Sequence, residues 1–328
     1  MCFIDEHWRK GHVLAKSRRL LDWQHACDDG TYNFLLAWDE AGGLLGILGY
    51  IPSSRYDPAI AAEEDVIWLA LWKTRPEAGR AGLGLALLRE LGRLHPRAQL
   101  GVNGINVTHP AMYRSLGFQS DELRQYYVTN PDSTGDLIST IDGQSIPVPR
   151  PGIASLKELD ATALAALNLP IREEETAPSK RPAYFIRRFL DHPFYNYRVF
   201  AIELHGETHA ILAVRLDRHE KLRALRIVDF LGDECALSQC GTALYDLMKE
   251  ADAHYVDFWQ FGLREEHLLA AGFAATTEIG PIVPTYFEPF VLARARIFFA
   301  IKTGVGRMPR IFKADGDQDR PNKIEGAS

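Results

Sequence analysis

The sequence predicts an α/β protein that contains two similar halves. The chain has 328 residues, a length that suits two domains better than one. In both halves a buried strand, a helix, a second strand and a helix ending in Gly-Phe follow one another in the same order. Residues 131–151 are rich in turn formers and are the expected linker. We therefore expect one domain over residues 1–135 and another over residues 136–328.

The pattern of apolar residues predicts the elements of the first half. Residues 63–74 form a nearly continuous apolar run, which is typical of a buried strand. Leu83, Leu87 and Leu91 recur at helical spacing, and Pro96 ends that helix. The expected elements are, in order, a helix at 7–25, strands at 32–39, 43–51 and 63–74, a helix at 82–94, a strand at 98–106, a helix at 109–118 and a strand at 122–130.

The second half repeats this order of elements. The expected elements are helices at 156–168 and 183–192, paired strands at 198–204 and 209–216, a buried strand at 223–233, a helix at 241–251, a strand at 254–262 and a helix at 264–273. The turn between the paired strands is centred on Gly206. The tail from Lys313 onward is polar, and we expect it to be poorly ordered beyond its start.

Composition excludes several classes of function. The chain is 46% hydrophobic and 24% charged, as soluble globular proteins are. Its net charge of −6 argues against a partner that is a nucleic acid. The four cysteines form no C-x-x-C pair, so we expect reduced thiols and neither a metal site nor a disulfide framework. The longest apolar run is too short to span a bilayer, and the start lacks an apolar signal segment. We expect a cytoplasmic protein without a membrane partner.

A glycine-rich loop opens the helix at 82–94. Its sequence is Gly79-Arg80-Ala81-Gly82-Leu83-Gly84, directly after a strand and Pro76. It matches neither the dinucleotide-binding fingerprint nor the nucleotide P-loop, which needs Gly-Lys-Ser/Thr. Successive backbone N–H groups at a helix N-terminus can bind a pyrophosphate. A tight strand-to-helix turn that needs glycine only for packing is the alternative explanation.

The segment downstream of this loop points to a family. Asn106 is followed by Tyr113 after seven residues and then by Gly117-Phe118. Together with the glycine loop, this order resembles the GCN5-related N-acetyltransferase (GNAT) superfamily, although Gly79 stands where that superfamily usually has Arg or Gln. The resemblance implies two tandem GNAT-like domains, each a mixed, mostly antiparallel twisted sheet flanked by helices. It also implies a coenzyme A thioester, acetyl-CoA or a hydroxyacyl-CoA, as the co-substrate.

The resemblance assigns roles to individual residues. The glycine loop and Asn106 are expected to bind coenzyme A, while the strand through Trp72 and Thr74 pairs with its extended pantetheine arm. Tyr113 is expected to protonate the departing thiolate as a general acid, the alternative being a half-buried helix tyrosine. Asp65 and His109 are equal candidates for the general base. Their alternatives are a solvated carboxylate at the end of a strand and a helix-capping histidine.

The second half resembles the same fold without its chemistry. It lacks the paired glycines, carries Asp233 and Glu234 in the corresponding loop, and has His267 in the place of the tyrosine. Two acids there would repel a pyrophosphate. We therefore interpret this half as a degenerate GNAT-like domain that either holds the acceptor or is a structural partner.

A narrower resemblance covers nearly the whole chain. It is carried by the segments HWRKGHVLAKSRRLLDWQH, GVNGINVTHPAMYRSLGF, HPFYNY, VPTYFEPF and FKADGDQDRPN. These segments resemble tandem-GNAT sugar N-acyltransferases of bacterial surface-polysaccharide loci, such as those for lipopolysaccharide O-antigen. The implied acceptor is the amine of a nucleotide-linked amino-deoxysugar, typically dTDP-linked. The residues that could contact a base, sugar or diphosphate are Arg55, Arg187, Tyr195, Tyr197, Trp259, Arg264 and Tyr286.

Two other functions fit parts of the sequence. One is a paired-GNAT aminoacyl transferase that uses charged tRNA, against which the acidic balance and the lack of a lysine-rich helical arm argue. The other is a non-catalytic protein that binds acyl-CoA or a nucleotide sugar. The register of Tyr113 with the glycine loop argues against that one.

Overall fold

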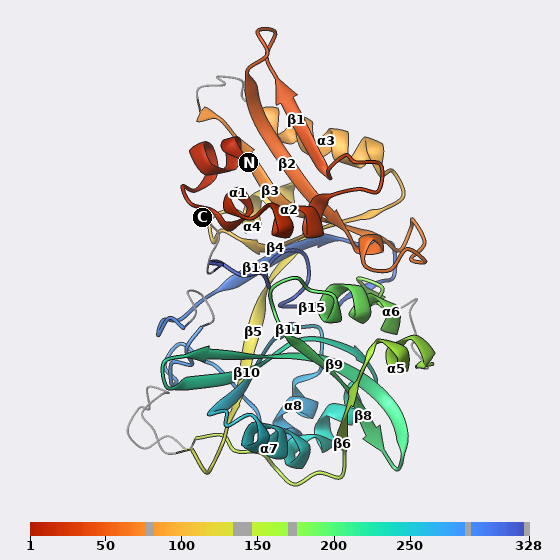
Figure 1. Ribbon diagram of the computed structural model, residues 1–328, viewed down its shortest axis with the longest axis vertical. Helices are drawn as coiled ribbons and strands as arrows, with labels where there is room; N and C mark the ends of the chain where they lie inside the picture. Colours follow the sequence, from red (N-terminus) through yellow and green to blue (C-terminus); the bar gives the residue numbers. More distant parts are fainter. Residues whose placement is uncertain (77–81, 134–145, 170–175, 286–289, 325–328) are drawn as a thin grey trace.

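The computed structural model describes residues 1–76, 82–133, 146–169, 176–285 and 290–324. Within these ranges, thirteen strands form one sheet that runs through both halves of the molecule in the order β1-β2-β3-β4-β13-β5-β11-β10-β9-β8-β6. Two short strands lie off this path, since β12 pairs with β5 and β15 with β11. Figure 1 shows the long strand β5 running from the upper half of the molecule down into the lower half. The chain therefore has a mixed α/β fold with a large, mostly antiparallel sheet.

The strands that come first in the sequence are β1 (Phe34–Trp38), β2 (Leu44–Pro52), β3 (Val66–Thr74), β4 (Gln99–Ile105) and β5 (Gln119–Thr129). The later strands are β6 (Ser155–Leu159), β7 (Thr176–Ala177), β8 (Tyr197–Leu204), β9 (Glu207–His219), β10 (Leu222–Gly232), β11 (Tyr255–Phe261), β12 (Ala274–Ala275), β13 (Ile297–Lys302), β14 (Met308–Pro309) and β15 (Ile311–Phe312). The helices are α1 (Val13–Lys16), α2 (Arg18–His25), α3 (Leu83–Leu94), α4 (Pro110–Ser115), α5 (Ala161–Ala166), α6 (Pro182–Phe185), α7 (Gly241–Glu250) and α8 (Glu265–Ala271). Single turns of π- or 3-10 helix are η1 (Ile4–Trp8), η2 (Ser53–Arg55), η5 (Ile186–Leu190) and η6 (Glu234–Gln239).

The two halves exchange strands. Strand β13, which comes late in the chain, lies between β4 and β5 and pairs antiparallel with both. Strand β5 pairs with β13 through Gln119–Leu123 and then crosses to β11 through Arg124–Thr129. Each half of the sheet therefore contains a strand from the other half of the sequence (Figure 1). The domain boundary at residue 135 stays a prediction.

Three of the apolar cores that lie against this sheet position its two halves. Leu87 and Leu91 of α3 pack on one face of the first half, as their helical spacing predicted, and Leu88 and α4 pack there with them. Helices α7 and α8 cover the corresponding face of the second half. The third core lies between the halves and combines Trp68 of β3 with residues of β11, β13 and α6. In each half the face of the sheet that these helices leave uncovered therefore packs into this one shared core.

The single helix expected at 7–25 is three separate pieces, η1, α1 and α2, with residues 9–12 and Ser17 outside them. Two further sequence-based expectations were wrong. Residues 156–168 were expected to be one helix, but Ser155–Leu159 forms an edge strand that pairs with β8 before α5 begins. The polar tail was expected to be poorly ordered, yet Asp315, Asp317 and Asp319 are at most 4% exposed. In both cases tertiary partners outweigh local preference, because the strand finds a neighbour and the acids find buried cations.

No helix in the described ranges has the length and apolar character needed to cross a membrane. Within the same ranges, no group of three or more His, Cys, Asp or Glu side chains is arranged to hold a metal ion.

Candidate active site

Strands β3 and β4 run parallel and then part. They pair only from Val66–Leu69 to Gln99–Val102 in the described chain. Beyond that point β3 continues along β2 as far as Thr74, and β4 continues along β13 as far as Ile105. We call the space between Ala70–Thr74 and Asn103–Ile105 the first fork. Its inner edges offer backbone N–H and C=O groups that an extended, amide-rich ligand can pair with.

Both strands carry a bulge at the mouth of the first fork. The β2–β3 register shifts so that Ala70 has no partner, and the β4–β13 register shifts so that Gly104 has none. Gly104 has φ +78°, a conformation that side chains other than glycine rarely adopt. A bulge re-aims the residues around it, and bulges are over-represented next to active sites. The two bulges therefore separate the strands and turn their backbone groups into the fork.

Helix α3 begins beside this fork. Gly82 is its N-cap with φ +96°, which a residue with a side chain would adopt only under strain. At Gly84, an added Cβ would lie 3.1 Å from Nε1 of Trp72, so this glycine lets α3 approach β3 closely. Leu83 follows Gly82 as the first helical residue. Helix α3 thus presents a positive N-terminus near the fork, while the predicted cofactor residues Gly79, Arg80 and Ala81 lie outside the described residues.

Tyr113 lies on the same side of the sheet as α3. It is 3% exposed, and its ring meets Trp72 edge-on with 6.2 Å between centroids. Burial raises the pKa of Tyr113 to about 12, so the hydroxyl keeps its proton at neutral pH. The Tyr113 hydroxyl makes no hydrogen bond to another described residue. The structure therefore brings Tyr113 and Trp72 together, with a phenol that is able to donate a hydrogen bond.

The candidate bases lie at different distances from the fork. Asp65 directly precedes β3 and lies five positions before Ala70, a separation of about 16 Å along a strand. Its carboxylate accepts from the Ser54 N–H at 3.0 Å and the Ser54 hydroxyl at 2.5 Å. Burial raises the pKa of Asp65, although these hydrogen bonds oppose the rise. His109 is exposed at the N-cap of α4, and its carbonyl accepts from the Tyr113 N–H at 3.2 Å.

Asn106 makes the turn before α4. Its side-chain oxygen accepts from the backbone N–H and the hydroxyl of Thr108, at 3.1 and 3.0 Å. The residue is exposed. This geometry gives Asn106 a structural task in aiming α4, and therefore Tyr113, at the fork. Thr74, another predicted contact of the pantetheine arm, pairs with Gly46 at the end of β3.

The predicted acceptor residues are spread over several sites. Arg55 donates to the carbonyls of Trp23 and Asp22 at 2.8 and 2.9 Å and lines an open cleft of about 540 Å³, as Arg187 does. Trp259 borders a separate cleft of about 610 Å³, where its buried indole N–H has no partner among the described residues. Arg264 is exposed and pairs with Glu234 at 3.0 Å. Tyr286 lies outside the described residues.

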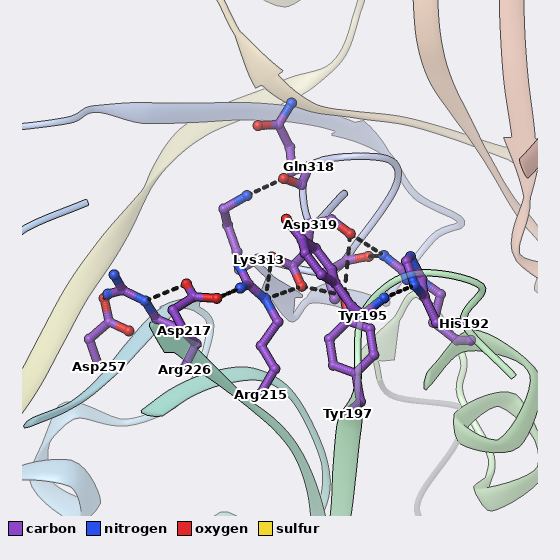
Figure 2. A network of polar contacts seen from close by, with 12 residues as sticks. His192, Tyr195, Tyr197, Arg215, Asp217, Arg226, Asp257, Lys313, Gln318 and Asp319 are labelled. Carbon is purple, nitrogen blue, oxygen red and sulfur yellow. Dashed lines mark hydrogen bonds and ion pairs between the residues drawn. The ribbon is translucent and has the colours of Figure 1, made fainter. Parts of the chain in front are cut away.

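Tyr195 and Tyr197 belong to a buried ionic network that sequence reasoning missed. Figure 2 shows Arg215 in this network. Its guanidinium is 2.9 Å from the Asp319 carboxylate and 4.4 Å from the centroid of the Tyr195 ring. The Tyr197 hydroxyl donates to Asp319 at 2.6 Å. Burial opposes the ionisation of Asp319, but Arg215 and Lys313 outweigh it and hold the pKa of that carboxyl well below its usual range. The alternation of acids from Asp315 to Asp319 is a weak sequence signal, because such spacing is equally common in exposed loops.

The C-terminal segment that carries these acids, residues 311–320, lies against both halves. On one side Asn103 of β4 donates to the carbonyls of Phe312 and Asp315 at 3.0 and 3.1 Å. On the other side Lys180 pairs with Asp315 at 2.7 Å. Burial lowers the pKa of Lys313 to about 7. The segment therefore joins the first fork to the second half of the sheet.

The corresponding fork in the second half is filled by this same segment. Strands β10 and β11 pair in parallel only from Ala224–Ile227 to Tyr255–Phe258 in the described chain. Farther along, β11 pairs with β15, and Ala314 donates to the carbonyl of Val228 at 3.0 Å. We call this place the second fork. Its backbone groups are paired within the protein, so they are not offered to a ligand.

The start of α7 is covered as well. An added Cβ at Gly241 would lie 1.9 Å from the carbonyl oxygen of Arg150. The Gly152 N–H donates to the Thr242 hydroxyl at 3.0 Å. Residues 150–152 therefore cover the N-terminus of α7.

His267 was expected in the place of the tyrosine, but Leu268 stands there: the Phe273 N–H donates to the Leu268 carbonyl at 3.1 Å, as the Phe118 N–H does to the Tyr113 carbonyl. His267 is 3.8 Å from Cys235.

Comparison with known proteins identifies the architecture. No family model and no curated protein matches the chain. Among solved structures, it is similar to a GCN5-related N-acetyltransferase from Anabaena variabilis ATCC 29413, with a TM-score of 0.50 and 12% identity over 83% of this chain and 62% of that one. It is also similar to a probable N-acyltransferase from Enterococcus faecalis V583, with a TM-score of 0.47 and 9% identity over 80% and 60%. The chain thus spans less than two thirds of either neighbour.

The first similarity extends over more of the chain than either half contains. At this level of identity it identifies the fold and nothing finer. The protein therefore has the mixed α/β fold of a GCN5-related N-acetyltransferase, as the order of the glycine loop and Tyr113 predicted.

Proposed function

We propose that this protein is an N-acyltransferase that moves an acyl group from an acyl-CoA thioester to the amine of a nucleotide-linked amino-deoxysugar, typically dTDP-linked. One observation carries the proposal. Among the described residues no strand pairs with the inner edges of the first fork, the fork opens beside the N-terminus of α3, and Tyr113 lies next to it. These are the three features that a pantetheine arm, a pyrophosphate and a leaving thiolate require in one place.

The reaction needs few groups from the protein. Backbone N–H groups along the inner edge of β3 hold the thioester and stabilise the oxyanion that forms when the amine attacks its carbonyl carbon. As the carbon–sulfur bond breaks, Tyr113 donates a hydrogen bond to the thiolate. Full proton transfer from a phenol with a pKa of about 12 to a thiolate with a conjugate-acid pKa of about 8.5 is uphill. Tyr113 therefore stabilises the leaving group mainly through a hydrogen bond.

The attacking amine must be neutral. Asp65 lies too far along β3 to accept its proton directly, so a water chain would have to connect them. His109 is exposed one turn before Tyr113. We propose that water or His109 removes the proton.

The second half supports the choice of a large acceptor. Its own fork is filled, so it has no free edge for a second acyl-CoA. Its C-terminal segment contacts β4 at the first fork, where Asn103 donates to the carbonyls of Phe312 and Asp315, and we propose that the acceptor approaches on this side. We therefore place coenzyme A at the first half and propose that the acceptor reaches both halves.

Thiol release tests the function. The full chain is incubated with acetyl-CoA or a hydroxyacyl-CoA and with dTDP-3-amino-3,6-dideoxyglucose, dTDP-4-amino-4,6-dideoxyglucose or no acceptor. In a parallel mixture radiolabelled aminoacyl-tRNA replaces the thioester as the donor, and the label transferred to the amine is counted. We expect free coenzyme A only with an amino-sugar nucleotide. Transfer from aminoacyl-tRNA would favour the tRNA-dependent alternative. Tight binding of acetyl-CoA without release in any mixture would favour the non-catalytic alternative.

A further inference from the structure

Gln318 lies against β4 at the mouth of the first fork. Atoms of its side-chain amide are 1.9 to 2.5 Å from the position that a Cβ at Gly104 would occupy. Any side chain at residue 104 would therefore displace Gln318. Gly104 is the bulged residue of β4, so the Gln318 amide meets the strand where it departs from β3.

The amide of Gln318 is available to a ligand. Gly104 is exposed and Gln318 is half-buried, so this place communicates with solvent. The amide makes no hydrogen bond to another described residue. Figure 2 shows it pointing away from the ionic network, toward the strands of the first half.

The backbone that carries Gln318 is held firmly. Lys313 donates to the carbonyl of Gln318, and the neighbouring Asp319 pairs with Arg215 at 2.9 Å. On the other side, the Arg320 guanidinium is 3.1 Å from Nε2 of His12. A residue held on both sides in this way presents its side chain in a defined direction.

Gln318 and Tyr113 lie on opposite sides of the sheet. Tyr113 packs in the core with α3, Leu69 and Val102. Asn103, which precedes Gly104, bonds to the C-terminal segment instead. An acyl donor in the fork would have its leaving group near Tyr113, so the amine must approach from the other side. Gln318 lies on that approach.

We propose that Gln318 is an acceptor-binding residue, and that its amide pairs with a hydroxyl group adjacent to the amine that receives the acyl group. The inference rests on the proposed function, because it requires an acyl donor in the first fork. A primary amide donates and accepts at once, which matches a hydroxyl. Lys313 is committed to the Gln318 carbonyl and Arg320 to Asp317 and His12, so a neutral group fits better than a carboxylate or phosphate.

Steady-state kinetics test this role. The full chain is assayed with acetyl-CoA and dTDP-4-amino-4,6-dideoxyglucose, and Gln318→Ala is compared with Gln119→Ala, which removes an exposed glutamine from β5. Loss of two neutral hydrogen bonds should raise the KM for the amino sugar roughly 5- to 50-fold in Gln318→Ala. The KM for acetyl-CoA should change less than about twofold, and Gln119→Ala should behave as the unaltered chain.

A deoxy acceptor identifies the contact. In dTDP-4-amino-3,4,6-trideoxyglucose the hydroxyl beside the amine is missing, so the unaltered chain should lose affinity while Gln318→Ala should lose almost none further. Gly104→Ala, which displaces the amide, should raise the same KM and should add little to Gln318→Ala.

The outcomes separate this inference from the function on which it rests. No turnover of any amino sugar by the unaltered chain would overturn both. Normal turnover with an unchanged KM in Gln318→Ala would overturn the role of Gln318 alone. Equal losses for both substrates together with a lower melting temperature would assign Gln318 a structural task, which also contradicts the proposal.

Discussion

The two forks of this protein have the same topology and opposite contents. In each half a pair of parallel strands separates after four residue pairs, Leu69 and Ile227 being the last paired residues of β3 and β10. No described strand pairs with the inner edges of the first fork, whereas the second fork holds β15 and the backbone of Ala314. The difference teaches that strand divergence alone does not make a cofactor site. What matters is whether the chain itself satisfies the exposed backbone groups.

Separating the halves should have the largest effect on this comparison. A fragment ending at Asn130 keeps the first fork but lacks β13, whose Phe299, Ala300 and Ile301 are fully buried. It would expose the edge and apolar face of β4, so we expect no cooperative unfolding transition and no acetyl transfer. Circular dichroism during heating and thiol release measure this. A fragment that retained full turnover would show that the first half is independent.

Removing the Tyr113 hydroxyl should then show whether the reaction takes place at the first fork. Tyr113→Phe keeps the ring packed against Trp72, and general acid assistance is typically worth about 10²–10⁴-fold. Since the raised pKa of Tyr113 favours a hydrogen bond over full transfer, we expect kcat to fall toward the lower end. The KM for acetyl-CoA should change little, and the acidic limb of the pH–rate profile, which reports the amine and its base, should survive.

Tyr245→Phe is the matched control, because Tyr245 lies at the surface of the second half and donates to Asp132 at 2.6 Å. Equal turnover of Tyr113→Phe and Tyr245→Phe would mean that Tyr113 only packs against its neighbours. Water would then be the proton donor to the thiolate.

The pH dependence of stability should test the state of Lys313, which lies between β15 and Ala314 in the segment that fills the second fork. Its folded-state pKa is about 7, below the ordinary value of 10.5, so the unfolded chain binds more protons between these values. The free energy of unfolding should therefore rise with pH, by about 2 kcal/mol from pH 7 to 9. Denaturant unfolding measures this, and Lys313→Met should abolish the rise while exposed Lys302→Met keeps it. The same slope in both variants would mean that Lys313 is charged in the fold.

A charge at the start of α3 should have the smallest of these effects. Gly82→Asp brings a carboxylate to the end of the helix that is proposed to bind a pyrophosphate, and we expect the KM for acetyl-CoA to rise about 10-fold. Gly82→Asn is the matched control, since asparagine tolerates φ +96° and carries no charge. Identical KM values for the two variants would remove the phosphate from this helix end.

The sequence by itself determined the local elements and the parts of the site that lie close together in the chain. The leucines of α3, the glycines that let it approach Trp72 and the spacing from Asn106 to Tyr113 act within a few dozen residues, so their patterns predict the fold. Their roles with coenzyme A stay predictions.

Only the tertiary structure decided the rest. The exchange of β5 and β13, the filled second fork and the approach of Gln318 to Gly104 join residues up to about two hundred positions apart, as the bond from Asn103 to Phe312 does. No local pattern encodes such pairings. From its sequence a polar tail is predicted to be exposed, and only the fold shows that buried cations compensate its acids. Asp315, Asp317 and Asp319 can lie in the interior because each pairs with a cation. Their partners are Lys180, Arg320 and Arg215, in that order.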